Sequence, residues 1–125
     1  MTRKRVLIAD DDETVRRLLR TTFADEAYEV VEAADGDQAL EQLEQSSPDI
    51  VVLDWKMPKR HGAFVLDELK ERYPRLPVIV LTAEGRQTQR AVAESLRADA
   101  FITKPFSPRE LLETVERLLG GRPTG

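Results

Sequence analysis

The sequence predicts an α/β domain in which one parallel sheet is covered by helices on both faces. Short apolar runs alternate with longer amphipathic segments along the 125 residues. Three of these runs are continuous, short and rich in β-branched side chains, as is typical of buried parallel strands. Parallel neighbours need crossover connections, and the amphipathic segments supply them. These observations indicate five successive strand–helix units arranged in three layers.

The predicted strands are the apolar runs themselves. They lie at residues 6–9, 30–31, 50–53, 78–81 and 101–102. The first, third and fourth runs contain no polar residue, which predicts that both faces of the sheet are buried.

The predicted helices lie between these strands and after the last one. Apolar residues recur in them with the period of an α-helix. The inner faces are marked, helix by helix, by Val15, Leu18, Leu19 and Phe23; Ala39, Leu40 and Leu43; Phe64, Val65, Leu66 and Leu69; Ala91, Val92 and Leu96; and Leu111, Leu112, Val115, Leu118 and Leu119. The fourth helix has the weakest pattern.

The helix boundaries follow from capping residues. Asp35 is the expected N-cap of the second helix. In the last helix Ser107 is the expected N-cap, Pro108 takes the first helical position and Glu110 completes a capping box. Glycines end that helix at residue 120. We therefore predict one domain over residues 1–120 and, at 121–125, a flexible tail or the start of a linker.

Composition excludes several classes of function. The chain has 19 Lys and Arg against 23 Asp and Glu, a net charge of −4, so it is not a general nucleic-acid binder. It has no cysteine, which excludes disulfides, thiolate metal sites and cysteine nucleophiles. No apolar run approaches the roughly 18 residues of a membrane span, and no signal-peptide pattern follows the first methionine. A soluble cytoplasmic protein without a membrane partner is expected.

Polar side chains follow four of the five predicted strands. Asp10 and Asp11 follow the first, Asp54 the third, Thr82 the fourth and Lys104 the fifth. Carboxyl ends of parallel strands lie at one edge of a sheet, and ligands bind there where the strand order reverses. In the flavodoxin-like order 2-1-3-4-5 that point lies between the first and third strands. This order gathers three carboxylates, a hydroxyl and an ammonium in one small site.

Such a site predicts a bound metal ion. Neighbouring carboxylates raise each other's pKa and cannot all stay ionised without compensation. Mg²⁺ suits the site, because it prefers oxygen ligands and retains several waters. Asp54 is then expected to act as a nucleophile toward phosphorus, with Lys104 and Thr82 contacting the phosphoryl oxygens. Asp12 is instead an expected helix N-cap.

Four blocks of the sequence occur together in order and at fitting intervals. They read Val-Leu-Ile-Ala-Asp-Asp-Asp at 6–12, Asp-Trp-Lys-Met-Pro-x-x-x-Gly at 54–62, Leu-Thr-Ala at 81–83 and Phe-Ile-Thr-Lys-Pro-Phe at 101–106. With these blocks the chain resembles the receiver domain of bacterial two-component response regulators. The single-domain chemotaxis regulator is the best-known similar type. The resemblance covers nearly the whole chain.

The resemblance implies a set of site residues. Asp54 is the implied phosphorylation site, and Asp10, Asp11, Asp54 and the backbone carbonyl of Lys56 are the implied ligands of Mg²⁺, for which Mn²⁺ can substitute. The implied phosphoryl contacts are Thr82 and Lys104.

The resemblance also implies a switch. Thr82 and Phe101 are the implied switch residues, which change the packing of the fourth helix, fifth strand and fifth helix. Pro105 follows an implied cis peptide bond, and Lys56 and Glu84 stand at positions that tune the phosphate lifetime. The chain departs from the family at residue 97, where arginine replaces the common glycine of a left-handed turn.

The implied partners are a sensor histidine kinase or phosphotransfer protein as phosphate donor, and a downstream protein or missing output domain as receiver of the signal. No direct nucleic-acid binding by this domain is implied. A monomer or a weak, phosphorylation-dependent dimer is expected. The domain is not expected to be an enzyme beyond its own phosphotransfer and auto-dephosphorylation.

Two alternatives belong to other classes. The pattern Asp10-x-Asp12-x-Thr14 also resembles the first motif of haloacid-dehalogenase-like phosphatases, with Asp10 as nucleophile. That reading leaves Asp54 without a role, and 125 residues leave no room for a cap domain. The other alternative is a pseudo-receiver, a constitutive binding module that never accepts phosphate. The complete acidic set argues against it.

Overall fold

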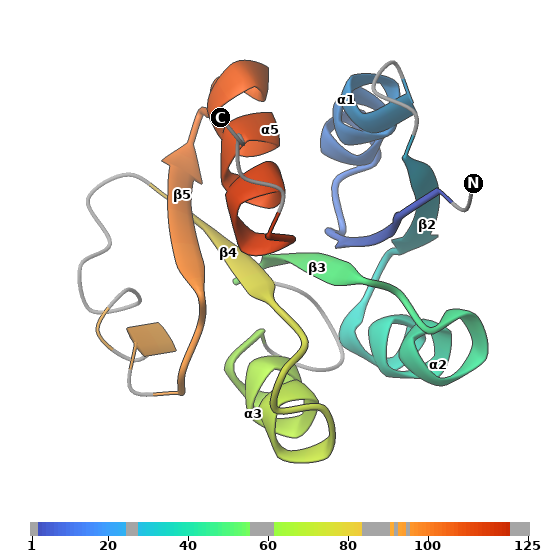
Figure 1. The fold of residues 1–125 in the computed structure, drawn as a ribbon, viewed down its shortest axis with the longest axis vertical. Helices are drawn as coiled ribbons and strands as arrows, with labels where there is room; N and C mark the ends of the chain where they lie inside the picture. Colours follow the sequence, from blue (N-terminus) through green and yellow to red (C-terminus); the bar gives the residue numbers. More distant parts are fainter. Residues whose placement is uncertain are drawn as a thin grey trace.

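The sheet of this protein is fully parallel. The computed structural model describes residues 3–24, 28–55, 62–83, 91, 93–94 and 96–120. The strands are β1 (Arg5–Ala9), β2 (Glu29–Ala33), β3 (Ile50–Asp54), β4 (Val78–Ala83) and β5 (Ala100–Lys104). They lie side by side in the order β2-β1-β3-β4-β5 (Figure 1). The predicted flavodoxin-like order is therefore confirmed, and it makes β1 and β3 direct neighbours.

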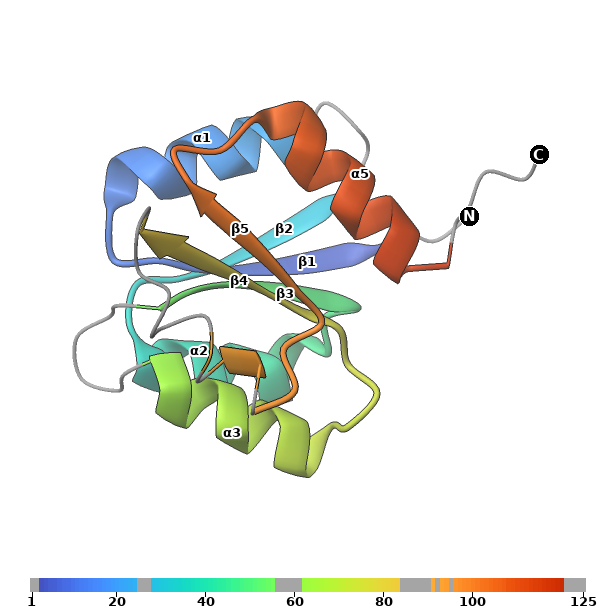
Figure 2. The same ribbon diagram turned by 90° about the vertical axis from the view of Figure 1, so that its left-hand side faces the viewer.

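The helices form the two outer layers. They are α1 (Glu13–Ala24), α2 (Gly36–Ser46), α3 (Gly62–Arg72) and α5 (Pro108–Leu118). Figure 2 shows α1 and α5 on one face of the sheet and α2 and α3 on the other. The predicted fourth helix falls mostly outside the described residues, although residues 91 and 93–94 are helical. The predicted tail at 121–125 also lies outside them.

Each face of the sheet has its own hydrophobic core. The core against α2 and α3 contains Leu7, Ala9, Val51, Leu53, Val78 and Val80 from the strands. The core against α1 and α5 contains Val6, Ile8, Ile50, Val52, Ile79 and Leu81. Successive strand residues therefore point to opposite faces of the sheet, and both faces are buried under helices. This double burial explains why the central strands have uninterrupted apolar sequences.

The predicted helix starts are confirmed. The Asp35 side chain accepts a hydrogen bond of 2.8 Å from the backbone N–H of Gln38 at the start of α2. Ser107 accepts from the N–H of Glu110 at the start of α5, and Pro108 is the first helical residue. The predicted lengths of the two shorter strands were wrong. Strands β2 and β5 each have five residues, because their backbone pairing with the neighbouring strands continues past the two apolar residues. Among the described residues, no helix has the length and apolarity to cross a membrane.

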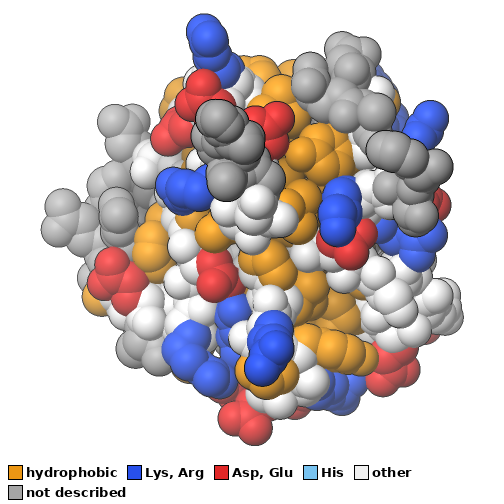
Figure 3. Space-filling model, viewed as in Figure 1, with side chains coloured by type: hydrophobic (Ala, Val, Ile, Leu, Met, Phe, Trp, Pro, Cys, Tyr) orange, Lys and Arg blue, Asp and Glu red, His pale blue; other side chains and the backbone are white. Residues whose placement is uncertain are grey.

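Figure 3 views the molecule from the amino ends of the strands, where hydrophobic side chains form a band between charged ones. A groove of about 540 Å³ lies at this end, between the loops that precede β3 and β4. It is lined by Pro48, Asp49, Tyr73, Pro74, Arg75, Leu76 and Pro77. None of the described site residues lines it.

Candidate functional site

Three carboxylates meet at the carboxyl edge of the sheet. Asp10 directly follows β1, Asp54 ends β3, and the pairing of these strands brings the two residues together. One carboxylate oxygen from each of Asp10, Asp11 and Asp54 lies within 4.8 Å of the other two. Asp10 and Asp54 are buried, whereas Asp11 is exposed. We call these three residues the acidic cluster, and the predicted gathering of three carboxylates is thereby confirmed.

Lys104 supplies a positive charge to this cluster from the end of β5. Its Nζ lies 3.2 Å from Oδ2 of Asp10 and 3.1 Å from Oδ1 of Asp54. The lysine therefore bridges the two buried carboxylates and donates a hydrogen bond to each. Within the described part of the chain, one ammonium faces three carboxylates, so these groups together keep excess negative charge when all are ionised.

The electrostatics reflect that imbalance. Burial, followed by the negative charge of Asp10, raises the pKa of Asp54 from 3.8 to about 6, although Lys104 acts in the opposite direction. Burial lowers the pKa of Lys104, but the charges of Asp54 and Asp10 outweigh it, and the net shift is upward. The lysine is therefore cationic, whereas ionisation of Asp54 is less favourable in the folded protein than in water.

Three other residues singled out from the sequence lie in or directly after the neighbouring strands β4 and β5. Thr82 is buried in β4, one residue past Leu81, which pairs with Asp54. Phe101 lies in β5, partly buried against the core on the α2 and α3 side. The peptide bond between Lys104 and Pro105 is cis, as the family resemblance implied.

Local backbone geometry shapes the loops that carry the cluster. Oδ1 of Asp12 accepts a 2.9 Å hydrogen bond from the N–H of Thr14 just inside α1, which confirms Asp12 as the N-cap. The N–H of Gly62 donates to the carbonyl of Trp55, and a Cβ at this glycine would lie 2.5 Å from that oxygen. Only glycine therefore permits this close approach of α3 to the end of β3.

Some predicted residues lie outside the described residues. Lys56 and Glu84, the residues implied to tune the phosphate lifetime, are among them, as is the Lys56 carbonyl implied as a metal ligand. These assignments stay predictions.

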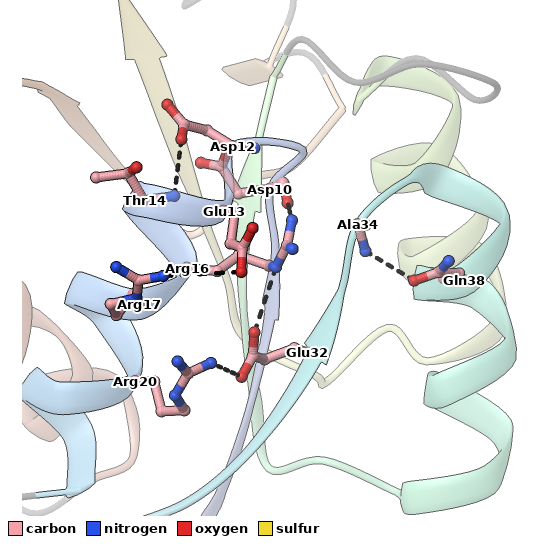
Figure 4. Close-up of polar contacts among 10 residues, drawn as sticks. All are labelled: Asp10, Asp12, Glu13, Thr14, Arg16, Arg17, Arg20, Glu32, Ala34 and Gln38. Atoms are coloured by element: carbon pink, nitrogen blue, oxygen red, sulfur yellow. Dashed lines mark hydrogen bonds and ion pairs between the residues drawn. The ribbon is translucent and has the colours of Figure 1, made fainter.

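One group near the cluster was missed from the sequence. Arg16 of α1 donates a 2.7 Å hydrogen bond from a terminal guanidinium nitrogen to the backbone carbonyl of Asp10. Figure 4 shows this guanidinium between Asp10 and Glu32 of β2, with Arg20 also directed at Glu32. The sequence signal was the spacing of six residues between Asp10 and the arginine, but the pairing with β2 depends on how α1 packs.

The arrangement distinguishes the two aspartates proposed as nucleophiles. Asp10 is 0% exposed, and its carboxylate oxygens accept hydrogen bonds from the backbone N–H of Asp12 and from Lys104. Asp54 is 7% exposed and borders the exposed Asp11. A reacting phosphoryl group therefore has better access to Asp54, which argues against the phosphatase alternative.

The comparisons with known proteins agree with this site. A family model described as the response regulator receiver domain matches residues 6–116. The chain is 36% identical over 116 residues to the alkaline phosphatase synthesis transcriptional regulatory protein PhoP of Bacillus subtilis (strain 168), covering 93% of this chain and 48% of that protein. It is 42% identical over 117 residues to the probable transcriptional regulator ycf27 of Cyanophora paradoxa, covering 94% and 48%. The chain thus spans about half the length of these relatives.

A solved structure shows the same similarity in three dimensions. The receiver domain of NtrX from Brucella abortus aligns with a TM-score of 0.88 at 32% sequence identity. The alignment covers 94% of this chain and 99% of that chain.

Proposed function

Because the chain belongs to the response regulator receiver domain family, we propose that it accepts a phosphoryl group on Asp54 from a histidine kinase or a phosphotransfer protein. In this step a carboxylate oxygen of Asp54 forms a bond to phosphorus while the bond from phosphorus to the donor's histidine nitrogen breaks. The product is an acyl phosphate, and the released imidazole takes up a proton. The domain is a signalling domain, and its own phosphotransfer and auto-dephosphorylation are its only chemistry in this proposal.

The observation that carries the proposal is the excess of negative charge around Asp54, a buried carboxylate that is still 7% exposed. Asp54 is the member of the buried pair that retains exposure, and Lys104 lies 3.1 Å from one of its oxygens. The ammonium is placed to neutralise phosphoryl oxygens after transfer, when Asp54 itself is esterified. Thr82 is the second expected contact at the same edge.

The donor set fits Mg²⁺. Three carboxylate oxygens within 4.8 Å of one another, incompletely balanced by one lysine, are the hard ligands this ion prefers. We propose Asp10, Asp11, Asp54 and the Lys56 carbonyl as the residues that hold it, with Mn²⁺ as a substitute. When bound, the ion neutralises charge on the carboxylates and on the phosphoryl oxygens.

The output of the switch is the surface next to β5. Thr82 and Phe101 lie on neighbouring strands, since Val80 of β4 pairs with Phe101 of β5. Movement of Thr82 toward the phosphoryl group is proposed to change the packing of Phe101, and with it the face formed by the fourth helix, β5 and α5. A downstream protein or an output domain reads this face, and the domain itself does not bind nucleic acid. We place it in the cytoplasm, as a monomer or a weak dimer formed on phosphorylation.

Acetyl phosphate labelling tests the proposal. We expect one phosphoryl adduct in the presence of Mg²⁺, mapped to Asp54 by trapping and mass spectrometry, and no adduct in Asp54→Asn. An adduct on Asp10 would instead support the phosphatase alternative. Mg²⁺ binding without any adduct, including with a phosphotransfer protein as donor, would indicate the pseudo-receiver. Replacing Lys56 or Glu84 in the labelled protein tests their proposed role, which predicts a several-fold change in adduct half-life.

A further inference from the structure

We propose that Arg16 is a positioning residue for the metal site, which fixes the peptide group between Asp10 and Asp11 and thereby aims the exposed Asp11 carboxylate. This inference rests on the proposed Mg²⁺ site and adds to it a residue that does not touch the ion. The contacts that carry it are the bonds of the Arg16 guanidinium to the Asp10 carbonyl, at 2.7 Å, and to Glu32, at 3.3 Å.

Every polar group of Asp10 takes part in a hydrogen bond. Its N–H donates to the carbonyl of Ala33 on β2, and its two carboxylate oxygens accept from Asp12 and Lys104. Its carbonyl is the remaining group, and Arg16 donates to it. This carbonyl belongs to the peptide that leads into Asp11. Because a peptide is planar, holding the carbonyl also fixes the direction in which the chain enters Asp11.

Asp11 depends on this constraint more than Asp54 does. Asp54 is anchored by the β3 ladder and by Lys104. Asp11 is exposed and follows the end of β1, so strand pairing does not hold it. Its direction is set by the backbone around it, and Arg16 bonds to the peptide on its amino side.

The arginine is itself held in place. Its side chain is 16% exposed, and its Nε lies 3.3 Å from an oxygen of Glu32 on β2. Arg20, one turn further along α1, pairs with the other oxygen of Glu32 (Figure 4). A planar guanidinium that is hydrogen-bonded on two edges has little conformational freedom. It therefore holds the loop after β1 at a fixed position relative to β2.

The positioning role of Arg16 and the repulsion between its positive charge and the metal ion predict opposite effects on Mg²⁺ binding when Arg16 is removed. Arg16 carries a positive charge close to the cation site, so on Coulombic grounds its removal should tighten Mg²⁺ binding. If Arg16 positions Asp11, its removal should weaken binding despite that relief. Partners of metal ligands typically change affinity about tenfold when they are removed.

The test measures the Mg²⁺ dissociation constant from the fluorescence of Trp55, the sole tryptophan, which follows Asp54 directly. Urea unfolding is measured in parallel, so that every titration is made on folded protein. The variants are Arg16→Ala, Arg16→Lys and the matched control Arg17→Ala. Arg17 is exposed on the same helix turn and pairs only loosely with Glu13, at 3.8 Å.

We expect the dissociation constant to rise about tenfold in Arg16→Ala. In Arg16→Lys, which keeps the charge but loses the planar fork, we expect a rise of several-fold. Arg17→Ala should bind Mg²⁺ as tightly as the wild type or more tightly. An unchanged or tighter constant in both Arg16 variants would overturn the inference, even if their stability fell, and Arg16→Lys decides alone if Arg16→Ala does not fold. Failure of the wild type to bind Mg²⁺ would overturn the proposed function as well.

Discussion

Among the described residues, two lysines pair with aspartates, at opposite ends of the sheet, and the two pairs differ in their charge balance. At the amino end, Nζ of Lys70 lies 2.6 Å from Oδ2 of Asp99, so one cation meets one anion. At the carboxyl end, Lys104 faces the three carboxylates of the acidic cluster. The first pair is balanced, and the second site is not. Burial of a lysine beside an aspartate therefore does not by itself indicate a ligand site, whereas the uncompensated carboxylates beside Lys104 leave negative charge for a cation to neutralise.

Each member of the balanced pair also makes a hydrogen bond to the backbone. Lys70 is 4% exposed and donates to the carbonyl of Leu76 at 2.8 Å as well as to Asp99. The same oxygen of Asp99 accepts from the N–H of Val78 at the start of β4. The pair therefore joins α3, β4 and the segment before β5, and its role is structural.

The largest expected effect comes from breaking the balanced pair. Lys70→Met removes the two hydrogen bonds that the buried ammonium donates, to the Leu76 carbonyl and to the Asp99 carboxylate. It also leaves the more exposed Asp99 without its cation. Together these losses should cost about 3 kcal/mol of unfolding free energy. Urea denaturation measures this loss, while Mg²⁺ affinity should stay at the wild-type value. Arg72→Ala is the matched control, because Arg72 pairs with Glu44 and Glu68 at the exposed surface and should cost less than about 1 kcal/mol.

A double variant tests the reason for that loss. Adding Asp99→Asn to Lys70→Met removes the uncompensated charge, so part of the lost stability should return. A double variant that is less stable than Lys70→Met would contradict the charge argument.

The second effect sharpens the comparison at the acidic end. Asp11→Ala removes the exposed member of the proposed ligand set, so we expect Mg²⁺ affinity to fall at least about a hundredfold, which is close to 3 kcal/mol of binding free energy. Stability without Mg²⁺ should be unchanged or slightly higher, because the variant also removes a repulsive charge. Trp55 fluorescence and urea unfolding measure the two quantities.

The neighbouring Asp12→Ala is the control and should show the reverse pattern. Its loss as N-cap should cost about 1 kcal/mol of stability. Its side chain is not part of the acidic cluster, so the Mg²⁺ dissociation constant should stay within about twofold of the wild type. Equal effects of the two variants on Mg²⁺ binding would remove the distinction between ligand and cap.

The third effect concerns pH. The folded pKa of Asp54, about 6, exceeds its ordinary value of 3.8. The folded protein therefore holds this proton more tightly, and it loses stability as pH rises through the interval between the two values. Asp54→Asn cannot ionise, so without Mg²⁺ it should exceed the wild type in stability by about 3 kcal/mol at pH 8 and match it near pH 4.

Unfolding by urea at both pH values, in the presence of EDTA, measures this difference. The exposed Glu41→Gln on α2 is the control and should differ little from the wild type at either pH. Addition of Mg²⁺ should stabilise the wild type more than Asp54→Asn. If Asp54→Asn gained the same stability at pH 4 and pH 8, ionisation of Asp54 would not be what destabilises the folded wild type.

The unbalanced site was predictable from the sequence, whereas the balanced pair was not. Asp10, Asp54, Thr82 and Lys104 each follow an apolar run, and parallel strands bring their carboxyl ends to one edge. Lys70 instead stands in the polar segment Leu-Lys-Glu-Arg of α3, where a lysine is typical of a solvated helix face. Its burial depends on Asp99, which is 29 residues away.

Arg16 was missed for the same reason. Its contact with Asp10 spans six residues, but the contact with Glu32 spans 16 and requires the packing angle of α1 against β2. Periodicity predicts which face of a helix is apolar, and it does not predict which polar side chain of the other face reaches a neighbouring strand. Sequence patterns therefore predict the fold, the acidic cluster and Lys104, but not the contacts that Arg16 makes with Asp10 and Glu32.

The smallest expected effect lies next to the balanced pair. Arg97 has a φ of 70°, and the N–H groups of Arg97 and Ala98 donate to the carbonyls of Glu94 and Ala93, the helix ending that normally takes glycine at this position. The predicted left-handed turn is thus kept despite the arginine. Relief of the Cβ strain in Arg97→Gly exceeds the added entropy of the unfolded chain, so stability should rise by up to about 1 kcal/mol.

Arg97→Ala keeps the Cβ and loses only the guanidinium, so it should show no such gain in urea unfolding. Both variants should leave the Mg²⁺ dissociation constant unchanged, because the turn supports the amino end of β5 and the acidic cluster lies at the other end of the sheet. A gain in Arg97→Ala equal to that in Arg97→Gly would assign the effect to the charge of the side chain rather than to the backbone. A change in Mg²⁺ affinity in either variant would show that the two ends of the sheet are coupled.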